Sequence, residues 1–202
     1  KGTLTADFGN GFDVTFSSLT AVDWFGTGLN TNYGANNLAN RWFSAALASN
    51  GGKLGYLVET EFGGNVAAAF NFFLNHKGFQ RLSDPNIAYV HKIGSAVNFG
   101  LAGHQNAGQV FDNPALQQLF AGIHASEVFA ITYKGDTSYG YSFDEPFTSG
   151  VVNAKDGFSH NGTFDFTLVT LDNPELPEPS AAIALMAVGG GLVALKKRSN
   201  NE

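Results

Sequence analysis

The chain has 202 residues, enough for one globular domain with a sizeable core, and it contains no cysteine. Disulfides, thiolate metal sites and cysteine catalysis are therefore excluded. The net charge is −6 overall and −8 before the C-terminal basic cluster, because eight bases face sixteen acids there. An acidic body repels phosphate backbones, so we expect no nucleic-acid binding.

Hydrophobic periodicity predicts the elements of the body. Strands are expected where apolar and polar residues alternate, and helices where apolar residues recur every three or four positions. In chain order, these elements are a hairpin over 3–19 turning at Gly9-Asn10-Gly11, a helix from Asn37 to Asn50, a helix from Val66 to Leu74, a hairpin over 87–101 turning at Gly94-Ser95, a short helix from Asp112 to Phe120, a hairpin over 127–144 turning at Gly135-Asp136, and a strand over 163–171. Together they indicate an α+β fold that is mainly antiparallel and sandwich-like, with about three short helices.

Capping residues are expected to delimit the predicted helices. Asn37 stands at the start of the first helix, and Trp42 lies on its apolar stripe and is predicted to be core. Gly51-Gly52 is expected to end this helix, and Gly78 to end the next one. Asp112 is expected to cap the short third helix.

The composition changes after residue 171. Three prolines within 172–180 forbid a regular helix or strand interior and predict a stiff linker. Residues 181–195 are uncharged and predict a hydrophobic helix about 22 Å long at about 1.5 Å per residue. This is a marginal span for a hydrocarbon core of about 30 Å. The basic residues after it should stay on the cytoplasmic side, so that the body faces outward.

The linker, the apolar run and the basic cluster together resemble the PEP-CTERM sorting signal. The motif is Pro177, Glu178, Pro179 and Ser180, and it is followed by the apolar run and by Lys196, Lys197 and Arg198. The resemblance implies secretion, retention in the inner membrane through 181–195 with the basic cluster as a stop, and processing at Pro-Glu-Pro by an exosortase-type enzyme. Proteins of this class are associated with cell envelopes, exopolysaccharide and biofilm matrix. The resemblance covers about the last 25 residues and implies routing, not activity.

Two stretches of the body, NLANRWFSAAL and GFQRLSDPNIAYV, are also similar to cyanobacterial members of the class. The expected organisation is an extracellular globular β-rich domain over 1–171, a Pro-rich linker with the sorting motif over 172–180, and an anchor helix with a basic tail over 181–202.

Histidine patterns give no metal motif. The chain has five histidines, which are His76, His91, His104, His124 and His160. None are spaced as H-x-H or H-x-x-x-H, so a zinc site is not expected. His91 and His104 could meet across the second hairpin, but a solvated or hydrogen-bonded histidine is the commoner outcome, and that interpretation is preferred.

Two stretches approach enzyme signatures without matching them. Residues 157–161, Gly-Phe-Ser-His-Asn, lack the final glycine of the G-x-S-x-G elbow and are interpreted as a loop. Glu59 and Glu61 alternate in a β-like stretch and would share one face, as glycosidase carboxylates do. Like charges on an exposed strand are far commoner, so no catalytic residue and no cofactor is assigned.

Oxygen ligands crowd the first hairpin turn, where Asp7, Asn10 and Asp13 lie close in sequence. This pattern suits calcium, but hairpin turns need the same residue types and no EF-hand loop is present. The turn interpretation is therefore preferred.

Aromatic residues offer stacking surfaces for sugar rings. Trp42 is expected in the core, whereas Trp24 and Tyr33 are candidates for exposure, and Trp24 is the preferred platform. An exposed platform would favour a carbohydrate-binding module, and a buried, pKa-shifted carboxylate or histidine pair in a pocket would favour a secreted hydrolase. The leading hypothesis is a non-enzymatic envelope protein of structural or adhesive type, associated with exopolysaccharide or with copies of itself.

Overall fold

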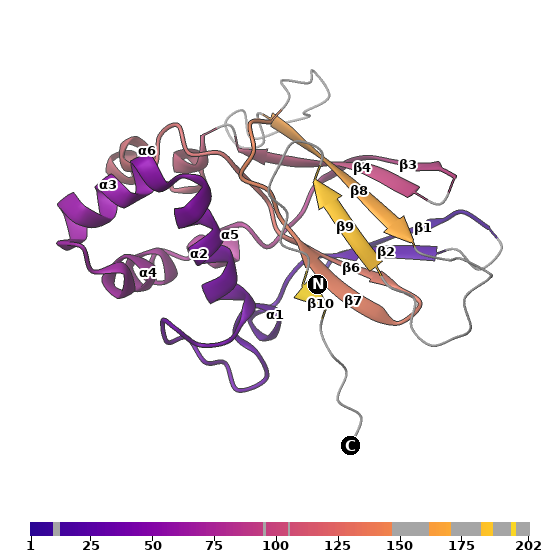
Figure 1. Cartoon of the computed structure of the whole chain (residues 1–202), viewed down its shortest axis with the longest axis horizontal. Coiled ribbons are helices and arrows are strands. Elements are labelled where there is room, and N and C mark those ends of the chain that lie inside the picture. Colours follow the sequence, from indigo (N-terminus) through magenta and orange to yellow (C-terminus); the bar gives the residue numbers. More distant parts are fainter. Residues whose placement is uncertain are drawn as a thin grey trace.

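The computed structural model describes residues 1–9, 13–94, 96–104, 106–146, 162–170, 183–187 and 195–196. Over these residues the fold is α+β, with mainly antiparallel strands in two sheets, so the predicted class is confirmed. Six α-helices are present where about three were predicted. The helices gather at one end of the two sheets (Figure 1).

The strands are β1 (Thr3–Asp7), β2 (Asp13–Ser17), β3 (Ile87–Ile93), β4 (Ala96–His104), β5 (Ala125–Ser126), β6 (Phe129–Tyr133), β7 (Asp136–Gly140), β8 (Gly162–Thr170), β9 (Ile183–Ala187) and β10 (Leu195–Lys196). The helices are α1 (Ala21–Phe25), α2 (Leu38–Ser49), α3 (Gly51–Phe62), α4 (Val66–Asn75), α5 (Gly78–Arg81), the 3₁₀ helix η1 (Ala107–Val110) and α6 (Pro114–Leu119).

The two sheets have the orders β1-β2-β6-β7-β10 and β3-β4-β8-β9, and β5 pairs with β4. The three predicted hairpins are confirmed as β1–β2, β3–β4 and β6–β7. The third turn falls one residue earlier than predicted. Lys134 and Gly135 both adopt positive φ, 49° and 82°, which is what a two-residue turn of type I′ requires.

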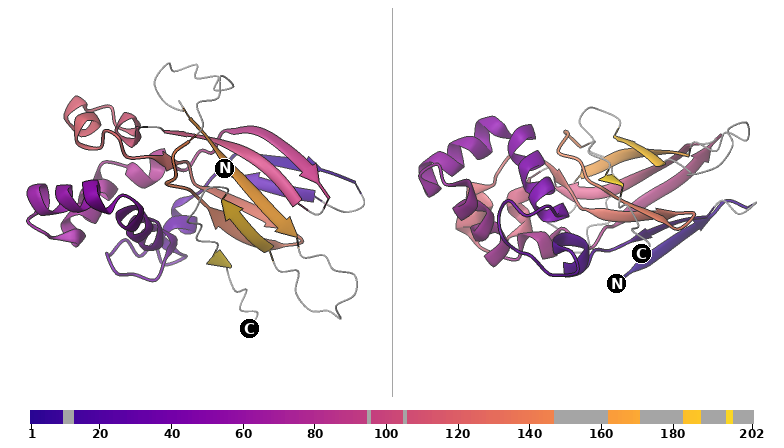
Figure 2. Two further views of the ribbon diagram at one scale, coloured as in Figure 1. Left: turned by 45° about the horizontal axis from the view of Figure 1, so that its top comes forward. Right: turned by 60° about the horizontal axis from the view of Figure 1, so that its bottom comes forward.

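An apolar core lies between the two sheets, which face each other in Figure 2. Phe99 of β4 is at its centre and is fully buried. Its ring lies 4.8 Å from that of Phe16, 5.1 Å from that of Phe129 and 5.3 Å from that of Phe166, so rings from both sheets interlock. In β2 and β8 these residues alternate with polar ones, and this alternation made the strands predictable.

A second core joins the helices to the outer face of the first sheet. Its hub is Phe79 of α5, which is 2 % exposed. The Phe79 ring contacts five others within 5.8 Å, those of Trp24, Phe25, Trp42, Phe70 and Phe73. Aromatic pairs of this kind add to the free energy gained from burial, so four helices are fixed around one side chain.

The prediction that the first helix ends before Gly51-Gly52 is confirmed, but a further helix, α3, begins at these glycines and was not predicted. Asn50 ends α2 and also precedes α3, which continues to Gly63, where φ is 59°. Leu54, Val58 and Phe62 recur every four residues and pack against the helical core, so packing overrides the two glycines.

Two other helix boundaries differ from the prediction. Gly78 begins α5, whereas α4 ends at Asn75 with His76 as its C-cap. Asn113 caps α6 by accepting from two backbone N–H groups, whereas Asp112 pairs with Arg81. The neighbouring amide and carboxylate are equally good caps, so the sequence alone could not choose between them.

The short helix α1 was not predicted. Thr20 caps it, and both the backbone N–H and the hydroxyl of Thr20 donate to the Asp23 carboxylate, at 2.8 and 2.7 Å. The Tyr139 hydroxyl of β7 donates to the same carboxylate at 2.9 Å, which fastens α1 to the first sheet. Burial opposes ionisation of Asp23, but these bonds and the charge of Lys1 leave its pKa below the usual range.

The C-terminal prediction of a hydrophobic helix over 181–195 differs from the described part of that run. Ile183–Ala187 form β9, a strand rather than a helix, along the edge of β8. The free edge of β8 offers backbone partners, and strand pairing satisfies the N–H and C=O groups of an apolar segment as a helix does. Within the described residues, no helix has the length and apolar character needed to cross a membrane.

The sorting motif lies outside the described residues, as do Lys197 and Arg198. Lys196 belongs to β10, where its backbone lies opposite Ser138 of β7.

Replacing each tryptophan in turn by phenylalanine compares the contributions of the two buried indoles to stability. The Trp24 Nε1–H donates to the Ser83 hydroxyl at 2.7 Å, whereas the Trp42 Nε1–H has no partner among the described residues. We expect Trp24→Phe to lower the free energy of unfolding by about 1 to 2 kcal/mol more than Trp42→Phe does, because a buried hydrogen bond is lost only there. Urea unfolding followed by circular dichroism measures the difference, and equal losses would contradict this assignment.

Candidate functional site

Most of the candidate catalytic and metal-binding residues predicted from the sequence do not come together in the structure. His91 lies opposite Asn98 near the β3–β4 turn, whereas His104 lies opposite Ala125 of β5, at the end of β4 beyond its pairing with β3. The two histidines therefore do not meet across the hairpin. Residues 157–161 lie outside the described part of the chain.

Glu59 and Glu61 belong to α3, not to a strand, so the predicted shared face is wrong. Residues two apart on a helix point in different directions. The pair therefore lacks the geometry of glycosidase carboxylates.

The first hairpin does bring two of the calcium candidates together. Asp7 and Asp13 are directly opposite each other in the β1–β2 ladder, and Asn10 lies outside the described residues. Desolvation and then the negative charge of Asp7 raise the pKa of Asp13. Within the described residues, no group of three histidine or carboxylate side chains has the arrangement of a metal site.

A polar cluster that the sequence analysis missed lies where β4 meets β5. It combines His104, Ser126 and Glu127, all at most 2 % exposed, and these are residue types of hydrolase triads. The Ser126 hydroxyl is committed to the backbone, because it donates to the Glu127 carbonyl and accepts from Ser142 N–H. Glu127 accepts from Asn86 N–H at 2.7 Å. A fully buried hydroxyl that makes two hydrogen bonds to the backbone supports the fold and is not placed to attack a substrate.

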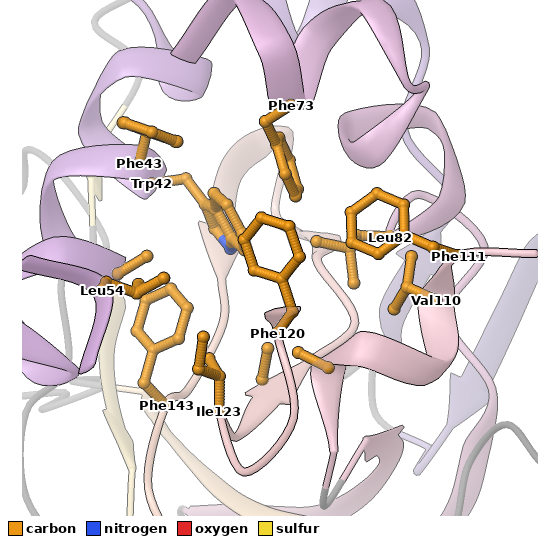
Figure 3. Close-up of a pocket in the computed structure, with 13 residues that line it drawn as sticks. Trp42, Phe43, Leu54, Phe73, Leu82, Val110, Phe111, Phe120, Ile123 and Phe143 are labelled. Carbon is orange, nitrogen blue, oxygen red and sulfur yellow. The ribbon is translucent and has the colours of Figure 1, made fainter. Parts of the chain in front are cut away.

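An apolar cavity of about 40 Å³ lies among the helices, and aromatic and aliphatic side chains converge on it (Figure 3). Trp42, Phe73 and Phe120 are among its walls, and none of its lining residues is titratable. A cavity that binds benzene measures about 150 Å³. This space is therefore a packing gap of the helical core and not a substrate site.

The loop between α1 and α2 is the best-built surface feature of the described chain. Two buried asparagines hold it, Asn37 and Asn40, each 7 % exposed. Asn40 accepts from Gly34 N–H at 2.6 Å and donates to the Asn32 carbonyl at 3.1 Å, while Asn37 donates to the Asn30 carbonyl at 2.7 Å. Asn37 also accepts from the backbone N–H of Asn40, which caps α2. Buried amides that use their donors and acceptors on the backbone fix a loop without secondary structure.

This loop and α2 together line an open depression of about 570 Å³. Tyr33 lies at one side, 40 % exposed, and its ring rests 5.6 Å from that of the buried Phe70. Exposed Asn36 and Ser44 and partly exposed Arg41 add hydrogen-bonding groups along the wall. The depression is open and shallow, so it would cover one face of a ligand and not enclose it.

The aromatic candidates are thereby resolved. Trp42 is 5 % exposed and belongs to the core, as predicted, but the prediction that Trp24 is an exposed platform was wrong, because its indole is 2 % exposed. The capping box of Thr20 turns the segment around Trp24 into a helix that faces Phe79. Tyr33 is the exposed ring.

The outer face of the second sheet is a weaker candidate surface. Tyr89 lies over Gly100, where a Cβ atom would come within 2.3 Å of the ring. Its hydroxyl donates to Asp165, and burial followed by this bond raises the pKa of Tyr89 well above its usual value. The Tyr89 hydroxyl is thus already hydrogen-bonded within the protein, which makes it a poorer ligand contact.

No family model, no curated protein and no solved structure matches the chain in comparisons with known proteins. Any functional assignment therefore depends on the chemistry of the chain itself.

Replacing Asn40 by alanine should loosen the loop that carries Tyr33. The change removes partners from Gly34 N–H and from the Asn32 carbonyl, so we expect a loss of about 1 to 3 kcal/mol in the free energy of unfolding. Chymotrypsin should then cleave after Tyr33 faster than in the unmodified protein. Asn36→Ala is the matched control, since this exposed side chain makes only a 3.4 Å bond to Arg41. Equal cleavage rates in the two variants would contradict the role of Asn40.

Proposed function

We propose that the chain is a non-catalytic protein of the cell envelope whose outward surface binds extracellular polysaccharide. The binding part is argued from the exposed Tyr33 ring, which a hydrogen-bonded loop holds at the edge of an open, largely apolar depression that also carries polar groups from Asn36, Arg41 and Ser44. Sugars present apolar ring faces and a rim of hydroxyls. An aromatic ring flanked by amide, hydroxyl and guanidinium groups complements both.

Rigidity supports a binding role for this surface. Ordering a flexible side chain or loop on binding costs free energy, and Tyr33 and its loop are ordered in advance by Phe70 and the two buried asparagines. The depression is open and shallow, which suits one or two rings of a long chain better than an enclosed metabolite.

The secreted hydrolase is the less favoured alternative. The buried serine cluster near β5 is bonded to the backbone, and the apolar cavity is lined by no titratable group. Catalysis requires an acid, base or nucleophile that reaches the substrate. Turnover of an ester, glycoside or peptide by the purified chain would overturn the proposal.

Routing is the second part of the proposal and rests on the C-terminal sequence. Pro177, Glu178 and Pro179 would be recognised by an exosortase-type enzyme, and residues 181–195 would anchor the chain in the inner membrane until processing. Residues 183–187 pair with β8, and we expect the whole run to form a helix in lipid instead, because each unpaired backbone polar group is costly in a bilayer. Lys196, Lys197 and Arg198 would hold its end on the cytoplasmic side.

Tyr33→Ala should weaken binding to polysaccharide about tenfold or more, because the stacking surface is lost. Titration calorimetry against a panel of neutral and acidic polysaccharides gives the affinities. Tyr56→Ala is the matched control, since Tyr56 is 68 % exposed on α3 and lies outside the depression. The proposal fails if the unmodified protein binds no member of the panel, or if the two variants lose affinity equally.

Changing Pro177, Glu178 and Pro179 together to alanine should block processing in a bacterium that carries the sorting enzyme. The apolar run is untouched, so membrane insertion should persist while the unprocessed mass accumulates. Intact-mass analysis of membrane and released fractions measures both. Pro174→Ala is the control, because it alters a linker proline outside the motif. Unchanged fragment mass and location in the triple variant would refute the sorting interpretation.

A further inference from the structure

The depression beside Tyr33 carries a single charged side chain, Arg41, and no carboxylate is among its lining residues. A positively charged surface is unusual for this chain, because the body before the C-terminal tail has a net charge of −8. A cation that stands alone in an acidic protein marks a place where an external anion gains local attraction against the general repulsion.

Arg41 also differs from the other described arginine in its partners. Arg81 pairs with Asp112 and donates to the Val110 carbonyl at 2.9 Å. The Arg41 guanidinium donates to the Asn36 side-chain oxygen at 3.4 Å, and among the described residues it has no carboxylate partner. Its capacity for charge-assisted hydrogen bonds is therefore largely unused.

The guanidinium of Arg41 is partly buried and partly at the depression. Its Nε atom is buried without a hydrogen-bond partner in the described part of the chain, as is the Tyr141 hydroxyl. Burial raises the pKa of Tyr141 to about 12, while the positive charge of Arg41 acts in the opposite direction. Arg41 therefore lies near buried Tyr141 on one side and lines the depression on the other.

We propose that the depression selects acidic polysaccharide, with Arg41 binding the carboxylate of a uronic acid residue whose ring stacks on Tyr33. The inference rests on the proposed binding function and names its ligand class. A planar guanidinium matches a planar carboxylate through two parallel hydrogen bonds, whereas a neutral sugar offers Arg41 no anion. Asn36 and Ser44 supply exposed partners for the ring hydroxyls.

Polygalacturonate and its fully methyl-esterified form test this selectivity, because they share one backbone and differ in the carboxylate charge. We expect the unmodified protein to bind polygalacturonate about tenfold more tightly than the ester, an effect of the size of one charge-assisted hydrogen bond. Arg41→Gln should remove this preference, and Arg41→Lys should keep part of it. Arg81→Gln is the matched control, with the same change in net charge at a site outside the depression.

The outcomes separate the two proposals. If the protein binds both polymers equally and Tyr33→Ala abolishes both, carboxylate selectivity is wrong and the binding function stands. If it binds neither these nor neutral polymers, the binding function itself fails. Dextran sulfate bound as tightly as polygalacturonate would show general anion attraction and overturn the carboxylate assignment. Thermal unfolding of Arg41→Gln confirms that the variant is folded, and a folded variant that retains the preference refutes the role of Arg41.

Discussion

The packing of five aromatic rings around Phe79 is the constraint on which the rest of the helical region depends. Trp24 and Trp42 bring α1 and α2 to this ring, and Phe73 brings α4. Because interiors pack at crystal-like density, none of these helices can shift without displacing the others. The position of α2 fixes one wall of the depression beside Tyr33. The shape of this exposed surface therefore depends on buried Phe79, which comes much later in the sequence.

Buried amides carry this constraint from α2 to the surface. Asn40 lies on the first turn of α2, and its side chain bonds to Asn32 and Gly34 on the far side of the loop. An amide at this depth that lost these partners would pay a desolvation cost, so the loop is held in one conformation. The result is an ordered aromatic ring beside an arginine that has no carboxylate partner in the described part of the chain, on a body with a net negative charge.

Sequence periodicity predicted the hairpins and the start of α2, because alternation and Asn37 are local signals. It did not predict α3, where tertiary packing of Val58 overrides two glycines, or α1, whose cap depends on Asp23 and on Tyr139 over a hundred residues later. The candidate site was partly visible: Tyr33 was one of three candidate rings. Its preference over Trp24 could not be predicted, since Trp24 is covered by Phe79 of α5 and Tyr33 rests on Phe70 of α4, both far along the chain.

Hydrogen–deuterium exchange with and without polygalacturonate locates the bound surface without altering any residue. We expect added protection over residues 30–48, where the loop and the first turns of α2 line the depression. Protection confined to the outer face of β3, β4 and β8, with residues 30–48 unchanged, would contradict it.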